Sequence, residues 1–283
     1  MYKKTCIIIT GPTAVGKTDY ALDLAKKNNT QIISADSRQC YRELNIGVAK
    51  PSPAQLKEIH HYFIDSHSIH KEVNVKVFEE YALEAVEKIF QSNDVAIIVG
   101  GTGLYIKAFC EGLDAVPAAN EMIRKEIRAS YESKGMEWLT REINGNDPLY
   151  FGSGEMKNPH RMMRALEVKL SSGNSILAFF SGKKIKRNFE LRKVHLDIPR
   201  EELYRRINKR VDEMMHAALL KEVESLFPFR HLNALQTVGY KELFSFIEGK
   251  ISLGNAIDEI KKNTRHFAKR QISLFKKFNG SIG

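Results

Sequence analysis

The sequence predicts an α/β protein in which a parallel sheet forms the core and a helical insertion domain interrupts it. Three observations lead to this prediction. Short runs rich in Ile and Val alternate with helical segments in the first third of the chain, and a glycine-rich segment follows the first run. Charged helical segments then replace the strand signals from about residue 112 to about residue 188. Alternating strands and helices are typical of parallel sheets, because parallel strands need a crossover connection.

The first strand is predicted over residues 5–10, TCIIIT, where a β-branched run ends at a Gly-Pro pair. The next segment, GPTAVGKT at residues 11–18, fits the pattern G-x-x-x-x-G-K-T, and a helix is predicted over residues 19–27. Strand, glycine-rich loop and helix are together the context that a phosphate-binding loop requires. These features predict a core of the P-loop NTPase type, with a coincidental glycine-rich turn as the alternative.

The loop is expected to hold phosphate groups in three ways. Gly11 and Gly16 let the backbone approach phosphate oxygens closely, and backbone amides at the start of the helix attract an anion. Lys17 adds a positive charge, and the Thr18 hydroxyl suits Mg²⁺. The pattern alone leaves open whether the phosphates belong to a nucleotide or to another substrate. The expected phosphate-binding residues are Gly11, Pro12, Thr13, Ala14, Val15, Gly16, Lys17 and Thr18.

Two further strands are predicted in the first third, at residues 31–34 and 95–99, with a helix at residues 75–91 between them. The strands end in ADSRQCY and GGTGLY respectively. Ligands of parallel α/β folds gather at the carboxyl ends of the strands. We therefore expect these two segments and the phosphate-binding loop to face one site.

The later part of the chain is predicted to complete this core around the insertion. Helices are predicted at residues 122–134, 136–143 and 160–171. A strand at residues 192–199 then returns to the sheet, and helices follow at residues 201–226 and 256–278. The core is thus expected to span residues 1–111 and 189–283, with the insertion at residues 112–188.

Charge and composition restrict the kind of partner. Lys and Arg number 13 against 12 Asp and Glu in residues 1–110, and 31 against 22 in residues 111–283. A basic second part is typical of a protein that binds a polyanion, although a merely soluble basic surface has the same composition. The chain has no long apolar run, and a strand begins almost at once, so we expect a cytoplasmic protein without membrane contact. Three cysteines, Cys6, Cys40 and Cys110, form no CxxC pair and predict neither disulfides nor a zinc site.

The end of the strand at residues 95–99 argues against a motor or switch NTPase. Such proteins usually end a neighbouring hydrophobic strand in an Asp that helps to hold Mg²⁺. Here Gly-Gly-Thr follows the strand, and Asp197 is a weaker candidate for the carboxylate. Two kinds of transferase fit the remaining pattern: a kinase for a small metabolite, or an enzyme whose leaving group is a diphosphate.

Several segments in consistent order resemble the tRNA dimethylallyltransferases, the isopentenyl transferases of bacteria. They are GPTAVGKT, ISADSRQCYRELNIGVAKP, VGGTGLYIKA, NPHRMMRALEV, VGYKEL and TRHFAKRQ, and they extend from Gly11 to Gln271. The resemblance implies transfer of a dimethylallyl group from dimethylallyl diphosphate to the exocyclic amine of the adenosine 3′-adjacent to the anticodon. It also implies that the loop holds the donor's diphosphate, that Mg²⁺ is the cofactor, and that the tRNA anticodon stem-loop is the partner, bound in part by the insertion.

The resemblance further implies catalytic roles. Asp36 becomes the base that accepts the amine proton, although an Asp at such a turn can equally bond its own backbone. Thr102 brings a hydroxyl near the reacting centre. Lys17 and Arg210 stabilise the charge that develops on the leaving diphosphate. The other charges on the helix of Arg210 are interpreted as a solvated face: Arg205, Arg206 and Lys209.

The target adenosine is stacked in the anticodon loop and must be extruded, which requires stacking and backbone contacts to a single-stranded loop. By resemblance, these contacts come from the segments around the base, from the insertion, from QTVGYK and from the last helix. The residues expected to contact tRNA are Asp36, Ser37, Arg38, Gln39, Thr102, Arg124, His160, Arg161, Arg164, Gln236, Thr237, Val238, Gly239, Tyr240, Lys241, Arg265, Lys269 and Arg270.

Other conspicuous residues are assigned to structure. Phe267 and Phe275 are assigned to packing, because apolar residues at helical spacing are more often core than stacking platforms. His60 and His61 are interpreted as structural, since adjacent side chains do not converge on a metal and no third ligand follows at a suitable spacing. Asn158 stands where many relatives have Asp, so a contact made by that carboxylate is not carried over to this chain.

Two other functions remain open on the residues alone. A P-loop kinase would use Asp36 as its base, bind ATP tightly and need no RNA. An RNA-binding ATPase-like module would bind tRNA with a salt-dependent affinity and transfer nothing. The three convergent loops favour the transferase, because a binding module needs no base beside a phosphate site. A monomer is the simplest oligomeric state.

Overall fold

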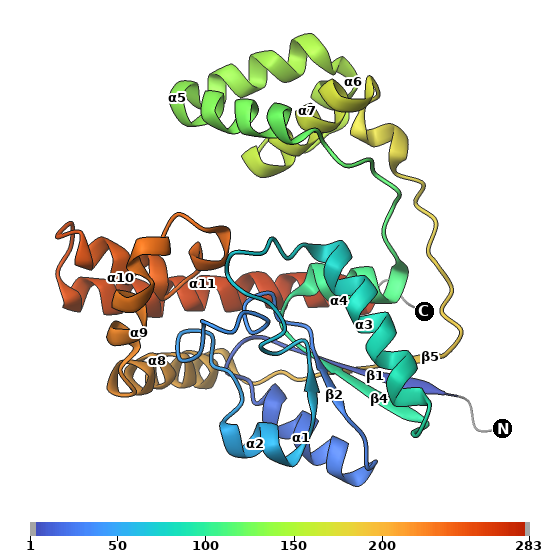
Figure 1. The fold of residues 1–283 in the computed structure, drawn as a ribbon, viewed down its shortest axis with the longest axis vertical. Coiled ribbons are helices and arrows are strands. Elements are labelled where there is room, and N and C mark those ends of the chain that lie inside the picture. The colour runs from blue at the N-terminus through green and yellow to red at the C-terminus, as the bar shows by residue number, and fades with distance from the viewer. Residues whose placement is uncertain (1–3, 281–283) are drawn as a thin grey trace. The chain divides into compact units, whose positions relative to one another are not determined.

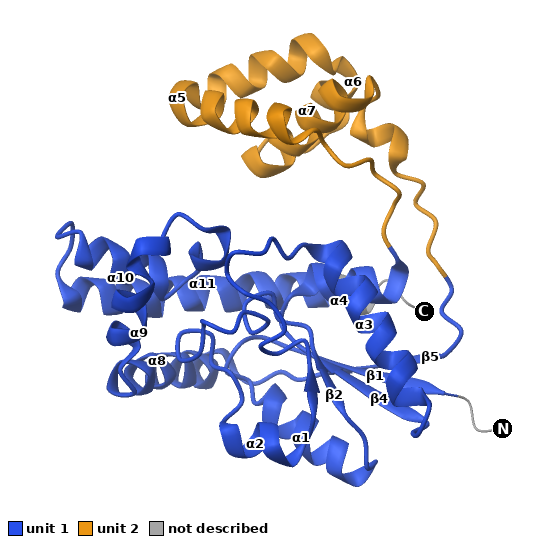
Figure 2. Cartoon of the chain, viewed as in Figure 1, with its two compact units in different colours: residues 1–112, 186–283 blue, residues 113–185 orange. Residues whose placement is uncertain are grey.

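The computed structural model describes residues 4–280, with side chains up to residue 276. The chain divides into two compact units, which Figure 2 colours separately. Unit 1 comprises residues 1–112 and 186–283, and unit 2 comprises residues 113–185. These boundaries lie within three residues of those expected for the core and the insertion.

Unit 1 is built on a five-stranded sheet in the order β3-β2-β4-β1-β5, in which every pair of neighbours is parallel. In register, Cys6 on β1 lies opposite Ala96 on β4 and Leu191 on β5. The predicted parallel α/β core is confirmed. The strands are β1 (Thr5–Thr10), β2 (Ile32–Ser34), β3 (His61–Tyr62), β4 (Val95–Val99) and β5 (Glu190–His195).

Different helices cover the two faces of the sheet, because successive side chains of a strand point to opposite faces. On one face, Ile8 and Ile98 pack in a cluster with α3 (Val75–Phe90) and α4 (Gly103–Glu111). On the other, Ile9 and Ile97 pack with α1 (Lys17–Lys27). Figure 1 shows α1 and α3 on opposite sides of the sheet. The continuous apolar run of β4 therefore reflects burial on both faces.

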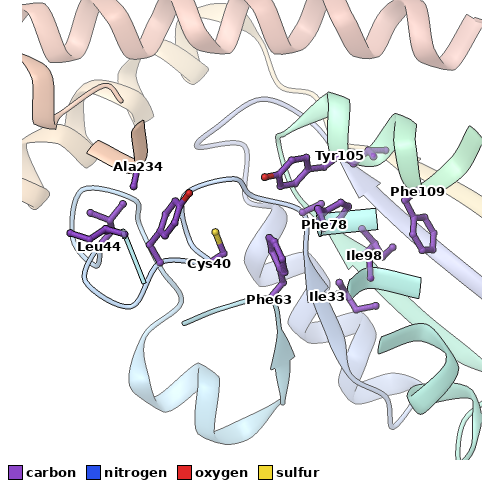
Figure 3. Close-up of a cluster of buried hydrophobic side chains, with 14 of the residues drawn as sticks. Ile33, Cys40, Leu44, Phe63, Phe78, Ile98, Tyr105, Phe109 and Ala234 are labelled. Carbon is purple, nitrogen blue, oxygen red and sulfur yellow. The ribbon is translucent and has the colours of Figure 1, made fainter. Parts of the chain in front are cut away.

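Aromatic rings form the centre of the larger cluster (Figure 3). Phe63 meets Phe78 edge to face, with ring centroids 5.1 Å apart. Phe78 also stacks on Tyr105, with centroids 4.3 Å apart and ring planes 10° apart. Since Tyr105 lies two residues after Gly103 in α4, this packing fixes the start of α4 against α3.

The C-terminal part of unit 1 is helical. A single helix over residues 201–226 is a wrong prediction, because Ala218 adopts a left-handed conformation with φ 71° and separates two helices. Alanine is the best helix former, so the local sequence gives no sign of this break. The elements are α8 (Arg200–His216), α9 (Leu219–Leu226), η2 (Phe227–Phe229), η3 (Asn233–Leu235), α10 (Tyr240–Ile247) and α11 (Leu253–Gly280).

The last strand also differs from its prediction. Residues 192–199 were expected to form it, whereas β5 begins at Glu190 and ends at His195. Pro199 has no amide to donate to a ladder, and it stands at the N-cap of α8. The proline therefore begins a helix where the apolar pattern suggested a strand.

Several short elements were not predicted, because hydrophobic periodicity is a weak signal over so few residues. One of them carries a recognisable start signal: Ser52 and Gln55 form a reciprocal capping box at the start of α2. The missed elements are α2 (Pro53–Glu58), β3, α4, α10, η2 and η3, and in unit 2 α6 (Pro148–Ser153) and η1 (Ile176–Phe179).

Unit 2 is entirely helical in its regular elements. Its long helix α5 (Glu121–Asn146) is interrupted at Gly135, which has φ 69°. The interruption falls between the two predicted helices at residues 122–134 and 136–143. Met162 of α7 (Pro159–Ser172) packs with Leu139 of α5 in a separate hydrophobic core, to which η1 (Ile176–Phe179) contributes Ile176. Among residues 4–280, no helix combines the length and apolarity that a membrane crossing requires.

The aromatic stack generates a prediction about stability. We expect Phe78→Ala to lower the free energy of unfolding by about 3–5 kcal/mol, because it removes a completely buried ring and leaves a cavity. Leu104→Ala is the control, since Leu104 is 57% exposed beside Tyr105 and should change stability by less than about 0.5 kcal/mol. Urea unfolding measures both values, and similar values for the two variants would contradict the role given to the stack.

Candidate active site

A cavity of about 1030 Å³ opens in unit 1 beside the segments that follow β1, β2 and β4. Residues of loop 47–51 and of helices α8, α10 and α11 complete its walls. The structure therefore brings the three strand-end loops to one site, as the sequence predicted. The predicted residues that line the cavity are Thr13, Ala14, Gly16, Lys17, Thr18, Asp36, Ser37, Arg38, Gln39, Thr102, Arg210, Gln236, Thr237, Val238, Gly239, Lys241 and Arg270.

The phosphate-binding loop has the backbone that its glycines suggested. Gly11 has φ 148°, and a Cβ atom there would lie 2.5 Å from the Leu196 carbonyl oxygen. Gly16 has φ 100° at the start of α1, and Ala14 has φ 66° without being glycine. The first amides of α1 have no helical partner, and Gly16, Lys17 and Thr18 line the cavity.

Lys17 is held inside this loop. Its Nζ donates to the carbonyl oxygens of Gly11 at 3.0 Å and Pro12 at 2.7 Å. An ammonium has three protons, so one is left for a ligand. Burial, opposed by the Asp36 carboxylate and assisted by the Arg210 charge, lowers the Lys17 pKa to about 7. A buried ammonium of this kind gains its charge most readily when an anion binds beside it.

Arg210 reaches the same loop from α8. Its Nη1 lies 3.5 Å from the Thr13 hydroxyl oxygen, a long hydrogen bond. Burial lowers the Arg210 pKa, yet an arginine keeps its charge. Two positive groups from different parts of the chain thus face one loop. By contrast, Arg205 and Arg206 both pair with Glu202, as expected for a solvated helix face.

Asp36 forms a local turn with the backbone and also has a carboxylate oxygen that could act as a base. Its Oδ1 accepts from the amides of Arg38 at 2.8 Å and Gln39 at 3.2 Å, which is the local turn expected of an Asp. Among the described residues, Oδ2 has no hydrogen-bond partner. The carboxyl group lines the cavity half-buried, with one oxygen fixed by the backbone and the other available to a ligand.

Thr102 connects the two other loops. Its hydroxyl oxygen accepts from the Ser37 amide at 3.1 Å, and its own amide donates to the Ala35 carbonyl oxygen at 3.2 Å. The loops approach closely here, because a Cβ atom at Gly100 would lie 2.1 Å from the Ala35 oxygen. The Gly-Gly-Thr sequence is therefore needed for contact between the ends of β2 and β4.

Two residues beside Asp36 have their side chains engaged within the protein. Gln39 donates from Nε2 to the carbonyl oxygens of Val48 and Ala49, and accepts from Ser34. Arg38 donates to the Asn233 carbonyl oxygen. These side chains position the cavity wall, so a tRNA contact through them would have to use their remaining atoms or exchange these bonds.

The segment at residues 236–241 lines the cavity with one exception. The Tyr240 side chain, predicted to contact tRNA, is completely buried and donates its hydroxyl to Glu222, so that prediction is wrong for the side chain. Its ring packs so closely on Gly47 that a Cβ atom there would lie 2.6 Å away. Gly239 has φ 97° and precedes α10, where only glycine adopts the turn easily.

The last helix contributes in a different way from the prediction. Phe275 is completely buried, whereas Phe267, also assigned to packing, is 40% exposed and lines the cavity. The packing assignment of Phe267 is therefore wrong, because helical spacing does not reveal which face a neighbouring cavity leaves open. The Arg270 guanidinium lies 5.9 Å from the Phe267 ring centroid, and Lys269 is exposed. Arg265 instead donates to Asn208 at 2.7 Å.

The candidate residues of unit 2 fall into two groups. Arg124 and Arg164 both pair with Glu167, a largely buried carboxylate, and so neutralise a charge in the core of this unit. His160 and Arg161 are exposed at the start of α7. Asn158 caps this helix by accepting from both of their amides, which is the capping bond that an Asp would also make.

Two residues of the site, Gln271 and Glu222, were not predicted from the sequence. Glu222 accepts from the amides of Asn45, Ile46 and Gly47 and so holds the loop that forms one cavity wall. Gln271 bonds two of the strand-end loops. No local pattern announces such residues, because their partners lie far away in the chain.

The fold and site define a P-loop α/β protein in which two partly buried cations line one cavity with a half-buried carboxylate. This is the arrangement of a transferase that binds a phosphorylated donor. A family model described as IPP transferase matches residues 39–278. The chain therefore belongs to the IPP transferase family and is a prenyl-transferring enzyme.

Relatives and solved structures agree with this assignment. A tRNA dimethylallyltransferase of Christiangramia forsetii is 46% identical over 271 residues, which cover 96% of this chain and 90% of the relative. One of Flavobacterium johnsoniae is 44% identical over 280 residues, covering 97% and 91%. The tRNA isopentenylpyrophosphate transferase of Bacillus halodurans superimposes with a TM-score of 0.70 at 33% identity, covering 97% of this chain and 87% of that one. A eukaryotic dimethylallyltransferase acting on tRNA gives 0.79 at 26% identity, covering 95% and 69%.

The lowered pKa of Lys17 predicts how pH affects anion binding. Below pH 7 the ammonium is charged before the ligand arrives, whereas above pH 7 binding must also recruit a proton. The affinity for inorganic diphosphate should therefore fall by up to about tenfold for each pH unit above 7, relative to Lys17→Arg. Arginine stays charged, and the ionisation of diphosphate itself is common to both proteins. Calorimetric titrations at pH 6 to 9 measure the difference, and parallel profiles would contradict the prediction.

Proposed function

We propose that this enzyme transfers a dimethylallyl group from dimethylallyl diphosphate to the exocyclic amine of the adenosine 3′-adjacent to the anticodon in tRNA, releasing diphosphate. The observation that carries the proposal is the position of Asp36 in the same cavity as Lys17 and Arg210. A leaving diphosphate needs positive charge, and an attacking amine needs a base. The cavity supplies both.

The donor's diphosphate is proposed to bind the loop at residues 11–18. Lys17 has one free proton for an oxygen of the diphosphate, and Arg210 adds charge from α8. As the allylic carbon–oxygen bond breaks, charge grows on the departing oxygen. Groups already held out of water stabilise that charge without reorganising during the reaction.

Asp36 is proposed to accept the amine proton. The exocyclic amine of adenine is a weak nucleophile because its lone pair is delocalised into the ring. Loss of the proton to Oδ2 as the new carbon–nitrogen bond forms avoids a cationic product. Because Oδ1 is held by two backbone amides, the free oxygen has a fixed direction.

Mg²⁺ fits the donor atoms of the loop. The Thr18 hydroxyl lines the cavity next to Lys17, and magnesium prefers oxygen ligands that include substrate phosphates. Within residues 4–276, no cluster of three or more His, Cys, Asp or Glu side chains could hold a metal. We therefore propose that Thr18 and the diphosphate together hold the ion, which would neutralise charge on the leaving group.

tRNA is proposed to approach through exposed basic groups. Lys269 and Arg270 are exposed on α11, and His160 and Arg161 are exposed on α7. Phe267 offers an exposed ring at the cavity for a nucleobase. The target adenosine would have to leave its stack to reach Asp36, as in other enzymes that modify bases.

Label transfer tests the function and the base together. With Mg²⁺, unmodified tRNA and radiolabelled dimethylallyl diphosphate, the wild-type protein should place label in tRNA. Asp36→Asn should lower turnover by about 10²-fold or more, because an amide cannot accept the proton. Its oxygen still accepts the two turn bonds, so binding of tRNA and diphosphate should persist.

Asp94→Asn is the matched control, because this exposed carboxylate pairs with Lys4 outside the cavity. Full activity of Asp36→Asn would remove Asp36 from the mechanism. A wild-type protein that leaves tRNA unlabelled but consumes ATP would refute the proposed reaction in favour of a kinase.

The basic residues of α11 give a second prediction. Lys269→Ala combined with Arg270→Ala should weaken tRNA binding and reduce the slope of log affinity against log salt by up to about 2, one for each lost phosphate contact. Filter binding at several salt concentrations measures the slope.

Arg205→Ala with Arg206→Ala is the matched control, since it removes the same number of cations from a helix face where Glu202 neutralises them in part. An unchanged slope in the α11 variant would place α11 away from the RNA. An equal loss in the control would mean that the slope reflects overall charge and would contradict a specific contact by α11.

A further inference from the structure

Gln271 joins two loops that come from distant parts of the chain. Its Oε1 accepts from the Thr13 amide at 2.8 Å, and its Nε2 donates to the Gly101 carbonyl oxygen at 3.0 Å. The side chain is 6% exposed and lines the cavity. A single carboxamide on α11 thus spans the gap between the phosphate-binding loop and the loop after β4.

Only one orientation of the carboxamide satisfies both partners. A backbone amide can only donate and a backbone carbonyl can only accept, so Oε1 must face Thr13 and Nε2 must face Gly101. A carboxylate at this position would accept from Thr13 but repel the Gly101 oxygen. An aliphatic side chain would bond neither loop. Glutamine is therefore matched to the two loops it connects.

The chain makes room for this bridge with glycines. A Cβ atom at Gly101 would lie 2.2 Å from Nε2 of Gln271, and one at Gly103 would lie 2.2 Å from a methyl carbon of Leu274. The start of α4 therefore approaches α11 more closely than any residue with a side chain would permit. This close approach is an observation independent of the hydrogen bonds, and it places the same residue at the contact.

The bridge belongs to a series of hydrogen bonds that are linked through neighbouring residues of the chain. Gly101 precedes Thr102, whose hydroxyl accepts from Ser37, and Ser37 follows Asp36. At the other end, the loop residue Thr13 also receives the long bond from Arg210. The phosphate-binding loop is thus connected through Gln271 to the loop that carries the proposed base.

We propose that Gln271 is a positioning residue that sets the phosphate-binding loop at a fixed distance from the loop of Thr102 and Asp36. This inference rests on the proposed function and adds a residue that acts through other residues. It uses the backbone amide of Thr13, a residue that was predicted from the sequence to bind phosphate. That amide instead anchors the loop, so the ligand must rely on the amides nearer α1 and on Lys17.

The expected effect is on turnover more than on binding. Under the proposed function each substrate binds through groups other than Gln271, so each should bind nearly normally without the bridge. Transfer requires the allylic carbon and the amine to meet, and a displacement of about 1 Å can lower the rate about 10²-fold. If Gln271 only held α11 against the core, its loss would lower stability without lowering kcat more than substrate binding.

Two variants test the bridge. Gln271→Met keeps the length of the side chain and removes both bonds, and Gly101→Ala places a methyl group where Nε2 lies. Each should lower kcat about 10- to 100-fold, with the dissociation constant for inorganic diphosphate changed less than about threefold. The double variant should lose little more than the worse single one, because both changes break the same bond. Independent, multiplicative losses in kcat would overturn the proposal.

Hydrogen exchange of the Thr13 amide tests the bridge without any catalytic assay, and so independently of the proposed function. The Thr13 amide should exchange its proton with solvent at least about tenfold faster in Gln271→Met than in the wild type, because its acceptor is lost. NMR of the folded protein measures this exchange. Unchanged exchange, or faster exchange with normal kcat, would refute the bridge as a positioning device. If wild-type protein leaves tRNA unlabelled, the proposed function fails, and the exchange experiment alone decides whether the bridge holds the loop.

Discussion

The burial of the Lys17 ammonium is the constraint on which the rest of the site depends. A cation taken out of water is unfavourable unless hydrogen bonds and opposite charge replace its hydration. Here the carbonyl oxygens of Gly11 and Pro12 replace part of it, and the carboxylate of Asp36 favours the charged form. Lys17 lines the cavity, so water or a ligand there supplies the rest of that stabilisation. The loop is consequently shaped before binding, and an anion with several oxygens is the species that completes it.

Close backbone approach turns the sheet edge into a single site. Gly100 meets Ala35, and Gly101 meets Gln271, at distances that no Cβ atom would allow. Thr102 then supplies the hydroxyl that accepts from the next loop. The sequence Gly-Gly-Thr therefore has a geometric meaning as well as a chemical one. It removes two side chains so that three segments can meet, and it places one polar group where they do.

The sequence was sufficient for the parts of this architecture that depend on local pattern. The strand at residues 5–10, the loop after it and the gathering of three loops followed from β-branched runs and glycine spacing. The burial of Tyr240 and the exposure of Phe267 could not be predicted from the sequence. Tyr240 is covered by packing on Gly47, and Phe267 is exposed because it lines the cavity. Gln271 has partners 258 and 170 residues away. Long-range contacts of this kind leave no periodic signal in a single sequence.

The position of the carboxylate separates this site from that of a motor or switch NTPase. In those proteins the Asp at the end of a neighbouring strand helps to hold Mg²⁺. Here glycines follow β4, and the carboxylate follows β2, where backbone amides hold one oxygen of Asp36. A carboxylate engaged in binding a metal would be a poor proton acceptor, because the metal competes for the same lone pairs. Under the proposed function, its position after β2 leaves it available to the amine of the acceptor, while Lys17 and Arg210 stabilise the charge of the departing diphosphate. Under the proposed function, prenyl transfer follows from this separation of base and phosphate site on one P-loop sheet.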